Sequence, residues 1–191
     1  IKCTWKVGYI CKWSHIVTTG NYFLADYARK FCNDVRVIPT VVDTINTHNR
    51  IKDQQAHRMV IGWTGTFTNF VQLDTIIPVI RKLQEVYSFE FLVIADKDPA
   101  YCDIQYTFKK WNIKTEIDDL LNIDIGVMPL KNTILEQGKC AFKAIQYMSL
   151  GIPCVVSDVG ANRDVIVDGV NGFIVKDANA WIEKLSLLLQ S

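Results

Sequence analysis

Residues 137–160, QGKCAFKAIQYMSLGIPCVVSDVG, place Lys139, Lys143 and Gln146 four and three residues apart within an otherwise apolar stretch. That spacing predicts one polar stripe on a helix, because residues three and four apart share a helical face. Two lysines in the first turns of a helix oppose its dipole, and bound anionic oxygens would remove that penalty. The stripe is therefore either a solvated polar face or one side of an anion-binding site, and the periodicity favours neither.

The apolar positions of this segment predict how the helix packs. Phe142, Ile145 and Met148, together with Ser149, fall on the face opposite the lysines. These four residues are therefore expected to point toward a sheet. Gly151 follows the last predicted turn, where a glycine commonly ends a helix.

A second stretch with possible chemistry is GWTGTFTN, residues 62–69. Gly65 permits a tight turn, while Thr66 and Asn69 can cap a helix or bond a ligand oxygen. Backbone N–H groups in such a turn would suit a phosphate. An ordinary turn between a strand and a helix explains the same residues, and this motif alone favours that simpler interpretation.

Strands that alternate with helices must bring these stretches together. Such alternation predicts an α/β fold with a doubly wound, mainly parallel, Rossmann-like sheet. In such a sheet, ligands bind beyond the carboxyl ends of the strands where the strand order reverses. The expected strands are apolar runs near residues 59–63, 89–96, 123–129, 152–158 and 171–175.

The first part of the chain predicts a separate unit. Residues 15–39 contain a short strand, a helix that begins after Asn21, and a second strand. Residues 45–57 are polar and aperiodic, as in a linker. We therefore expect residues 1–45 to be the remnant of an N-terminal domain with its linker, and residues 46–191 to form a C-terminal Rossmann-like domain. The abrupt start without methionine suggests a fragment of a longer protein.

Composition narrows the class of partner. Lys and Arg total 21 against 20 Asp and Glu, for a net charge of +1, so no overall field favours nucleic acid. The six cysteines show no disulfide or CxxC spacing, which favours a reducing, cytoplasmic location. His15, His48 and His57 lack metal-ligand spacing, so no metal site is predicted.

The order of these pieces resembles a known family. The stretches IGWTGT, DIGVMPL and KCAFKAIQYMSLGIPCVVSDVGANRDVIVDGVNGFIV are similar to the C-terminal domain of retaining glycosyltransferases with the GT-B fold. VIPTVVDT, residues 37–44, resembles the family segment that leads from the first domain into the second. The resemblance begins at His15 and is most specific over GIPCVVSDVG and DGVNGF. It implies that residues 46–191 bind a nucleoside-diphosphate sugar.

The resemblance also implies roles for individual residues. The Gly65–Thr66 turn and Asn69 would face the diphosphate. A family motif of two glutamates falls on Gly138 and Gln146, so neither carboxylate is kept, although Glu136 lies close to the first. In the family the second glutamate holds ribose hydroxyls, a role that glutamine could still fill.

Further donor contacts follow from the same match. The backbone of Gly138, or Glu136 in its place, would meet the sugar, and Cys140 and Ala141 would lie beside the donor. A basic pair usual in the family is absent from GTFTNF. Lys139 and Lys143 would replace it, as in a subset of the family with GKC.FK at this point. Lys139, Lys143 and Glu136 are thus the expected catalytic residues.

The implied activity is transfer of a sugar to an acceptor hydroxyl in glycan or polysaccharide synthesis. The acceptor would be a glycan, a lipid-linked sugar or another hydroxyl compound, and the missing N-terminal domain would help to bind it. No cofactor and no metal are expected, since lysines and helix N-termini would neutralise the diphosphate. The resemblance allows peripheral contact with the inner face of the membrane. Two alternatives remain open: a non-catalytic nucleotide-sugar-binding or scaffold domain, and a GT-B-like sugar-nucleotide epimerase.

Overall fold

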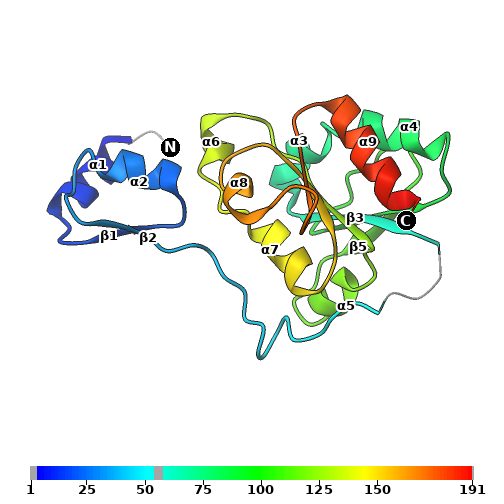
Figure 1. The fold of residues 1–191 in the computed structure, drawn as a ribbon, viewed down its shortest axis with the longest axis horizontal. Helices are drawn as coiled ribbons and strands as arrows, with labels where there is room; N and C mark the ends of the chain where they lie inside the picture. The colour runs from blue at the N-terminus through cyan, green and yellow to red at the C-terminus, as the bar shows by residue number, and fades with distance from the viewer. Residues whose placement is uncertain (1–3, 54–57, 191) are drawn as a thin grey trace.

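A computed structural model describes residues 4–53 and 58–190, which form a small N-terminal part and a larger C-terminal domain joined by an extended segment (Figure 1). In the N-terminal part, β1 and β2 pair in parallel, with Val17 beside Val35. Asn21 caps the helix between them, as the sequence predicts, because its side chain accepts a hydrogen bond from the Leu24 N–H. The elements of this part are α1 (Thr4–Trp13), β1 (Val17–Thr19), α2 (Tyr22–Ala28) and β2 (Val35–Val37).

Helix α1 was not expected from the sequence. Three of its aromatic residues recur every fourth position, so that consecutive rings meet along one face. The ring centroids of Trp5 and Tyr9 lie 5.9 Å apart, and those of Tyr9 and Trp13 lie 5.4 Å apart. Trp5 and Trp13 are nevertheless 61% and 77% exposed. Successive rings on this face of α1 thus contact one another while Trp5 and Trp13 stay largely exposed.

The C-terminal domain contains six parallel strands in the order β5-β4-β3-β6-β7-β8. This order confirms the predicted fold class, a doubly wound Rossmann-like sheet. The order reverses between β3 and β6, which are neighbours in space although two strands separate them in the chain. The strands are β3 (Val60–Gly65), β4 (Glu90–Ala95), β5 (Thr107–Lys110), β6 (Ile125–Met128), β7 (Cys154–Ser157) and β8 (Phe173–Val175).

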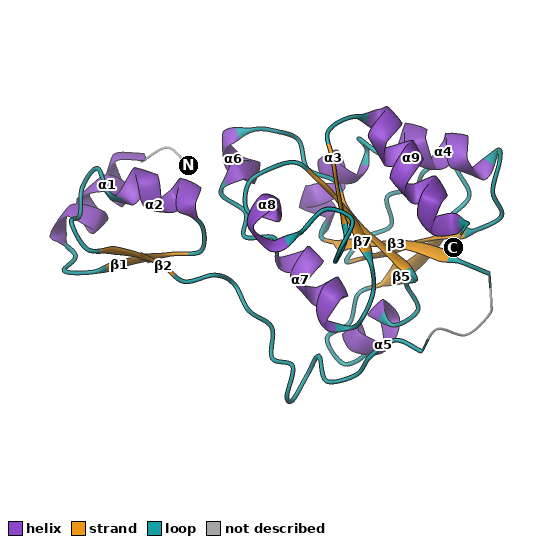
Figure 2. Cartoon of the chain, in the orientation of Figure 1, coloured by secondary structure: helices purple, strands orange, loops and turns teal. Residues whose placement is uncertain are grey.

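Helices cover both faces of this sheet (Figure 2). One core packs α3, α4 and α9 against one face, and the other packs α5, α7 and α8 against the opposite face. Alternate strand residues supply the two cores, because successive side chains of a strand point to opposite faces. The helical elements are η1 (Phe67–Asn69), α3 (Phe70–Leu73), α4 (Ile77–Gln84), α5 (Glu116–Leu120), α6 (Ile134–Gln137), α7 (Phe142–Ser149), α8 (Asn162–Val165) and α9 (Ala178–Leu189).

Three elements differ from the sequence prediction. Strand β5 was missed because its residues, TFKK, are mostly exposed at the sheet edge and lack an apolar pattern. Helix α6 was not predicted, since a single turn is too short to show periodicity. The helix expected after the turn at residues 62–69 is divided into η1, α3 and α4, and Pro78 stands at the start of α4, where proline is tolerated.

Tyr147 fixes α7 on the sheet. Its ring lies against Gly126 in β6, where an added Cβ would stand 2.4 Å from the ring. Its hydroxyl accepts a hydrogen bond from the Thr64 N–H of β3 at 3.2 Å. The side chain is fully buried, and burial raises the pKa of the phenol. One tyrosine therefore ties α7 to both strands that flank the reversal of strand order.

The segment before β3 is fastened to the domain. A buried ion pair joins Lys52 to Asp124 at 2.9 Å, and the Lys52 N–H donates to the Leu150 carbonyl at 2.8 Å. An exposed pair joins Arg50 to Asp118 at 2.6 Å. Residues 54–57, which include His57, lie outside the described residues. The domain boundary at residue 45 stays a prediction, but residues 50–52 belong physically to the C-terminal domain.

Candidate functional site

A pocket of about 190 Å³ opens where the strand order reverses. Its floor comes from the carboxyl ends of β3 and β6, and its wall from the segment that leads into α7. That volume is well below the roughly 300–1,000 Å³ typical of a complete ligand site, so the pocket suits one charged portion of a ligand. It is lined by Trp63, Asn69, Gln72, Met128, Pro129, Leu130, Lys139, Cys140, Phe142 and Lys143.

Lys139 is held at the pocket by two neighbours. Its ammonium donates to Asn69 Oδ1 at 3.0 Å, which links the α7 side of the pocket to the loop after β3. Glu136 Oε1 lies 3.8 Å from the same ammonium. The Lys139 side chain is about one-third exposed, so it reaches both the carboxylate and the open pocket. The predicted lysine and asparagine therefore meet at one point.

Lys143 lines the same pocket and is partly buried. Among the residues that the structure describes, no carboxylate or hydrogen-bond acceptor pairs with its ammonium. Burial, and secondarily the charge of Lys139, lower its pKa from 10.5 to about 8. An ammonium with that pKa is still mostly protonated at neutral pH. The pocket thus holds a desolvated positive charge that an anion would stabilise.

The predicted helix begins later than expected. Helix α7 starts at Phe142, and Ala141 before it has a left-handed φ of 55°, so Lys139 lies in the preceding turn. The expected stripe of Lys139, Lys143 and Gln146 on one helix is therefore wrong. The two lysines nevertheless line one pocket, and the charge of Lys139 acts on Lys143.

The expected core face of this helix is also wrong. Ala144 and Tyr147 are fully buried in the core beneath α7, whereas Phe142 is 45% exposed and lines the pocket. The predicted polar stripe did not identify the exposed face of the helix, because Gln146, which belongs to that stripe, is itself buried.

Gln146 is enclosed by a part of the chain that precedes the domain. Its Nε2 lies 3.3 Å from His48 Nε2 and donates to Glu116 Oε1 at 3.4 Å. Glu116 also accepts from the Trp111 indole N–H at 3.2 Å. Gln146 is 3% exposed and does not line the pocket, so its contact with a ribose stays a prediction. No local signal marks His48 and Glu116, since they join Gln146 only through the tertiary fold.

Glu136 is buried beneath the pocket rather than open to it. Gln72 Nε2 donates to its Oε1 at 2.7 Å, and Thr133 donates to its other oxygen. Gln72 in turn accepts from the Lys131 N–H at 2.7 Å. Glu136 therefore acts on Lys139 as a counterion in this arrangement. The sequence FVQLDTII carries no signal that separates Gln72 from the polar residues Asp74 and Thr75 beside it.

The loop after β3 is ordered by hydrogen bonds to its own side chains and to Asp96, which follows β4. Asn69 Nδ2 donates to Thr66 Oγ1 at 2.9 Å, and the Phe67 N–H donates to Asp96 Oδ1 at 2.7 Å. Gly65 leaves room for the Trp63 ring, which an added Cβ would approach to 2.4 Å. Of the three predicted residues here, Asn69 lines the pocket, whereas Gly65 and Thr66 are not among its lining residues.

The backbone before α7 holds the remaining predicted residues. Gly138 ends α6, Cys140 lines the pocket, and Ala141 is buried at the first turn of α7. Of the ten predicted residues, four line the pocket: Asn69, Lys139, Cys140 and Lys143. Within the described ranges no group of three potential metal ligands occurs. No helix in residues 4–53 and 58–190 has the length and apolar character needed to cross a membrane.

Comparison with protein families matches residues 58–191 to the glycosyl transferases group 1 model, which is more than two-thirds of the chain. The chain belongs to this glycosyltransferase family. Its matched portion contains every residue that lines the pocket. A comparison with curated proteins gives no sequence match.

Solved structures share the fold of this glycosyltransferase domain. A sucrose-phosphate synthase from Thermosynechococcus elongatus has a TM-score of 0.70 at 15% identity, over 97% of this chain and 51% of that one. A glycosyltransferase from Rickettsia africae gives 0.73 at 13% identity, over 97% and 57%. Anabaena HepE, in complex with UDP and glucose, gives 0.66 at 10% identity, over 93% and 53%. The chain thus spans about half the length of these structures.

Proposed function

We propose that the chain is the donor-binding half of a glycosyltransferase, and that its pocket binds the diphosphate of a nucleoside-diphosphate sugar. The partly buried ammonium of Lys143, which lines the pocket without a pairing carboxylate among the described residues, is the observation that carries the proposal. Lys139 supplies a second cation beside it, and Asn69 holds Lys139 in place. Two cations in a pocket of about 190 Å³ suit a diphosphate better than a neutral ligand.

The proposed reaction breaks the bond between the sugar's anomeric carbon and a diphosphate oxygen. A new bond forms from that carbon to an acceptor hydroxyl oxygen, and the proton of that hydroxyl passes to the departing diphosphate. Negative charge grows on the diphosphate as the first bond lengthens, so the two lysines bind the transition state more tightly than the ground state. Lys143 and Lys139 are the proposed catalytic residues, with Glu136 positioning Lys139. Retention of the anomeric configuration stays a prediction of the resemblance.

The ligand class is supported by the solved structures. HepE, which shares the fold, is described in complex with UDP and glucose. The shared fold and the two lysines of the pocket both favour a nucleoside diphosphate as the ligand of this chain. Direct donor contacts by Gly65, Thr66, Gly138, Ala141 and Gln146 stay predictions, because these residues lie outside the pocket lining.

We propose further that additional protein completes the N-terminal part and binds the acceptor. A sheet of two strands is too small to be stable alone, and α1 exposes Trp5 and Trp13. The acceptor, a hydroxyl compound such as a glycan or a lipid-linked sugar, would meet the donor between the two halves. Peripheral membrane contact stays a prediction.

Calorimetry of the full 191-residue chain with UDP, GDP, ADP and their sugars tests the donor site. At least one nucleotide should bind, and Lys143→Gln should weaken it by about ten- to a hundredfold, as expected for a lost charge-assisted hydrogen bond of about 1.5–3 kcal/mol. Lys110→Gln, in the exposed edge strand β5, is the matched control and should bind normally. Absence of nucleotide binding would reject the donor site and favour the scaffold alternative.

A sugar-nucleotide epimerase is distinguished by its products. A protein that converts a nucleotide sugar without any acceptor would be an epimerase. A transferase should instead consume the donor in proportion to glycosylated acceptor. Chromatography of the reaction products of the complete protein separates these outcomes.

A further inference from the structure

Asn21 joins the N-terminal part to the glycosyltransferase domain. Its side-chain Nδ2 donates hydrogen bonds to the carbonyl oxygens of Gln137 and Lys139, each at 3.1 Å. Its Oδ1 accepts from the Leu24 N–H at 2.9 Å, which caps α2. The residue is 3% exposed. A single buried amide therefore caps a helix in one part and holds a loop of the other.

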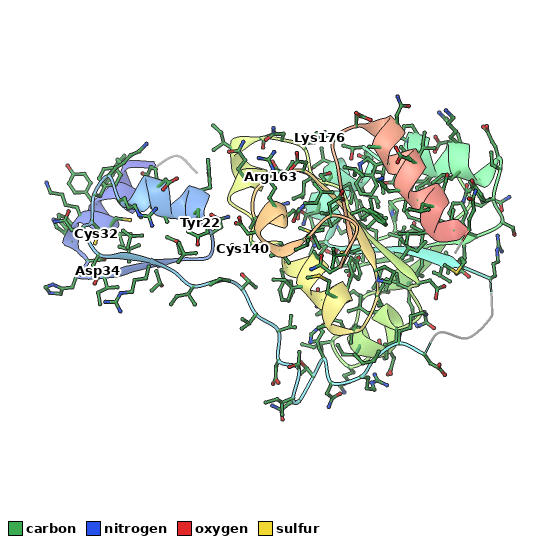
Figure 3. All side chains as sticks on the ribbon, in the orientation of Figure 1. Tyr22, Cys32, Asp34, Cys140, Arg163 and Lys176 are labelled. Carbon is green, nitrogen blue, oxygen red and sulfur yellow. The ribbon has the colours of Figure 1, made fainter. Side chains whose placement is uncertain are left out.

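The N-terminal part also packs closely against the C-terminal domain at the positions beside Asn21. A Cβ on Gly20 would stand 2.4 Å from Cys140 Sγ, and a Cβ on Gly138 would meet the Leu24 side chain at 3.4 Å. Figure 3 shows Tyr22, at the start of α2, on the side of the N-terminal part that faces Cys140. A methyl group at position 20 would therefore displace the Cys140 side chain.

The loop that Asn21 holds, residues 137–140, carries Lys139, one of the two cations of the donor pocket. Lys139 and Cys140 line that pocket, and the Lys139 ammonium bonds Asn69. On its other side the loop rests against Gly160, where an added Cβ would stand 2.9 Å from the Gln137 carbonyl oxygen. The loop is thus held between the N-terminal part and the loop after β7.

We infer that Asn21 is a positioning residue that couples docking of the N-terminal part to donor binding. With the amide in place, the Lys139 carbonyl is fixed and its ammonium is directed into the pocket. Without it, the loop loses two hydrogen bonds and Lys139 loses its fixed backbone. Coupling is reciprocal, so a bound nucleotide must also strengthen the docking. The inference rests on the proposed donor site, although Asn21 does not line that pocket.

Two substitutions separate the clamp from the helix cap. Asn21→Asp and Asn21→Ser keep an oxygen that can cap α2, because both residues are good N-caps. Both lose the amide donors, and the aspartate would also place a negative charge near two carbonyl oxygens. Asn21→Ala loses the cap as well and serves as the comparison for a purely structural effect.

Hydrogen exchange of the full chain measures the docking directly. Asn21→Asp and Asn21→Ser should speed exchange in residues 137–140 without any nucleotide present. Calorimetry should then show UDP, or whichever diphosphate the wild type prefers, binding about fivefold or more weakly. In the wild type the nucleotide should slow exchange in residues 137–140, and this protection should be reduced in both variants.

A second pair of substitutions tests whether nucleotide affinity lost at position 20 can be restored by a change at position 140. Gly20→Ala should weaken docking and nucleotide binding, because the new methyl group would collide with Cys140 Sγ. In Gly20→Ala/Cys140→Ala the nearest remaining atom, the Cβ of residue 140, lies at an ordinary 3.5 Å. The double variant should therefore recover the affinity of Cys140→Ala alone. If Gly20→Ala weakened binding by any route other than its collision with Cys140 Sγ, the double variant would not recover that affinity.

Two outcomes would overturn the inference. Unchanged exchange in Asn21→Asp and Asn21→Ser would show that the amide does not hold the loop. Faster exchange with unchanged nucleotide affinity would make Asn21 a structural contact without coupling. If the wild type binds no nucleotide, the proposed donor site fails instead, and the exchange data still decide whether Asn21 holds the loop.

Discussion

At the scale of single residues, environment decides the role of each charged side chain. Lys139 and Lys143 have the same chemistry, but Lys139 is held by Asn69 and Glu136 whereas Lys143 lies partly buried beside a like charge. Desolvation is the larger cause of the lowered Lys143 pKa. Lys143 therefore gains most from an anionic ligand, and this difference leads to a pH prediction.

Nucleotide affinity should fall as pH rises through about 8, the pKa of Lys143 in the folded chain. The diphosphate prefers the charged ammonium, which is lost above that pKa. Lys143→Arg should bind without this fall, because a guanidinium stays charged. Calorimetry across this pH range gives the comparison, and identical pH profiles for the two proteins would rule out Lys143 as the titrating group.

The stability of the unliganded chain should change in the opposite direction. Between pH 8 and 10.5 the unfolded chain holds more protons at Lys143 than the folded chain. Its contribution to the free energy of unfolding therefore rises with pH across that window. Below pH 8 both states are protonated, and burial of the charge opposes folding. Denaturant unfolding of wild type and Lys143→Gln should show this difference in slope.

Gln146 gives a second prediction at this scale. Gln146→Glu would restore the carboxylate that the family motif expects, but it would stand beside Glu116 Oε1, now 3.4 Å from the amide nitrogen. A buried carboxylate at position 146 would repel the partly exposed one of Glu116, so we expect a loss of about 1–3 kcal/mol in the free energy of unfolding. Adding Glu116→Gln should restore most of the loss. A fully stable Gln146→Glu variant would contradict this explanation of the glutamine.

At the scale of elements, α7 positions the site through its contact with β6. The Tyr147 ring occupies the space above Gly126, and its hydroxyl reaches β3. Both strands end at the pocket, so the helix, the two strands and the pocket wall share one packing unit. A defect in this contact should disturb stability and ligand binding together.

Gly126→Ala should lower the free energy of unfolding by about 1–3 kcal/mol, because its methyl group would stand 2.4 Å from the Tyr147 ring. Measured in a Tyr147→Ala background, the same substitution should cost much less. Chemical denaturation of the four proteins in this cycle gives the coupling energy. Equal costs in the two backgrounds would show that Tyr147 is not the obstacle.

At the scale of the whole molecule, the connecting segment is part of the domain that follows it. His48 packs against Gln146, Arg50 pairs with Asp118, and Lys52 pairs with Asp124. Asn21 provides a separate contact between the two parts. The N-terminal part is thus held by its own docking contact and by a connection whose end is fixed.

Lys52→Met should destabilise the C-terminal domain by about 3–5 kcal/mol, because it removes the ammonium beside the buried Asp124 carboxylate. Lys52→Met/Asp124→Asn should recover part of the loss, since an asparagine oxygen can still accept from the Val60 N–H. Arg50→Gln, at an exposed pair, is the matched control and should cost about 1 kcal/mol or less. Thermal or denaturant unfolding distinguishes the variants.

The sequence alone determined the fold class and two of the chemical groups that matter. Apolar runs in β3, β4, β6 and β7 predict a parallel sheet because strands covered on both faces must be apolar throughout. Lys139 and Lys143 were singled out by their type and spacing, with support from a family resemblance. Elements without a periodic pattern, such as β5 and α6, escaped prediction.

Only the tertiary structure decided which polar residues meet. The left-handed turn at Ala141 takes Lys139 off the helix and brings it to Asn69, while Gln146 is covered by His48 from a distant segment. Asn21 reaches a loop more than a hundred residues away. Local periodicity reports which face of an element is apolar, but burial and pairing of a charge depend on what packs against it.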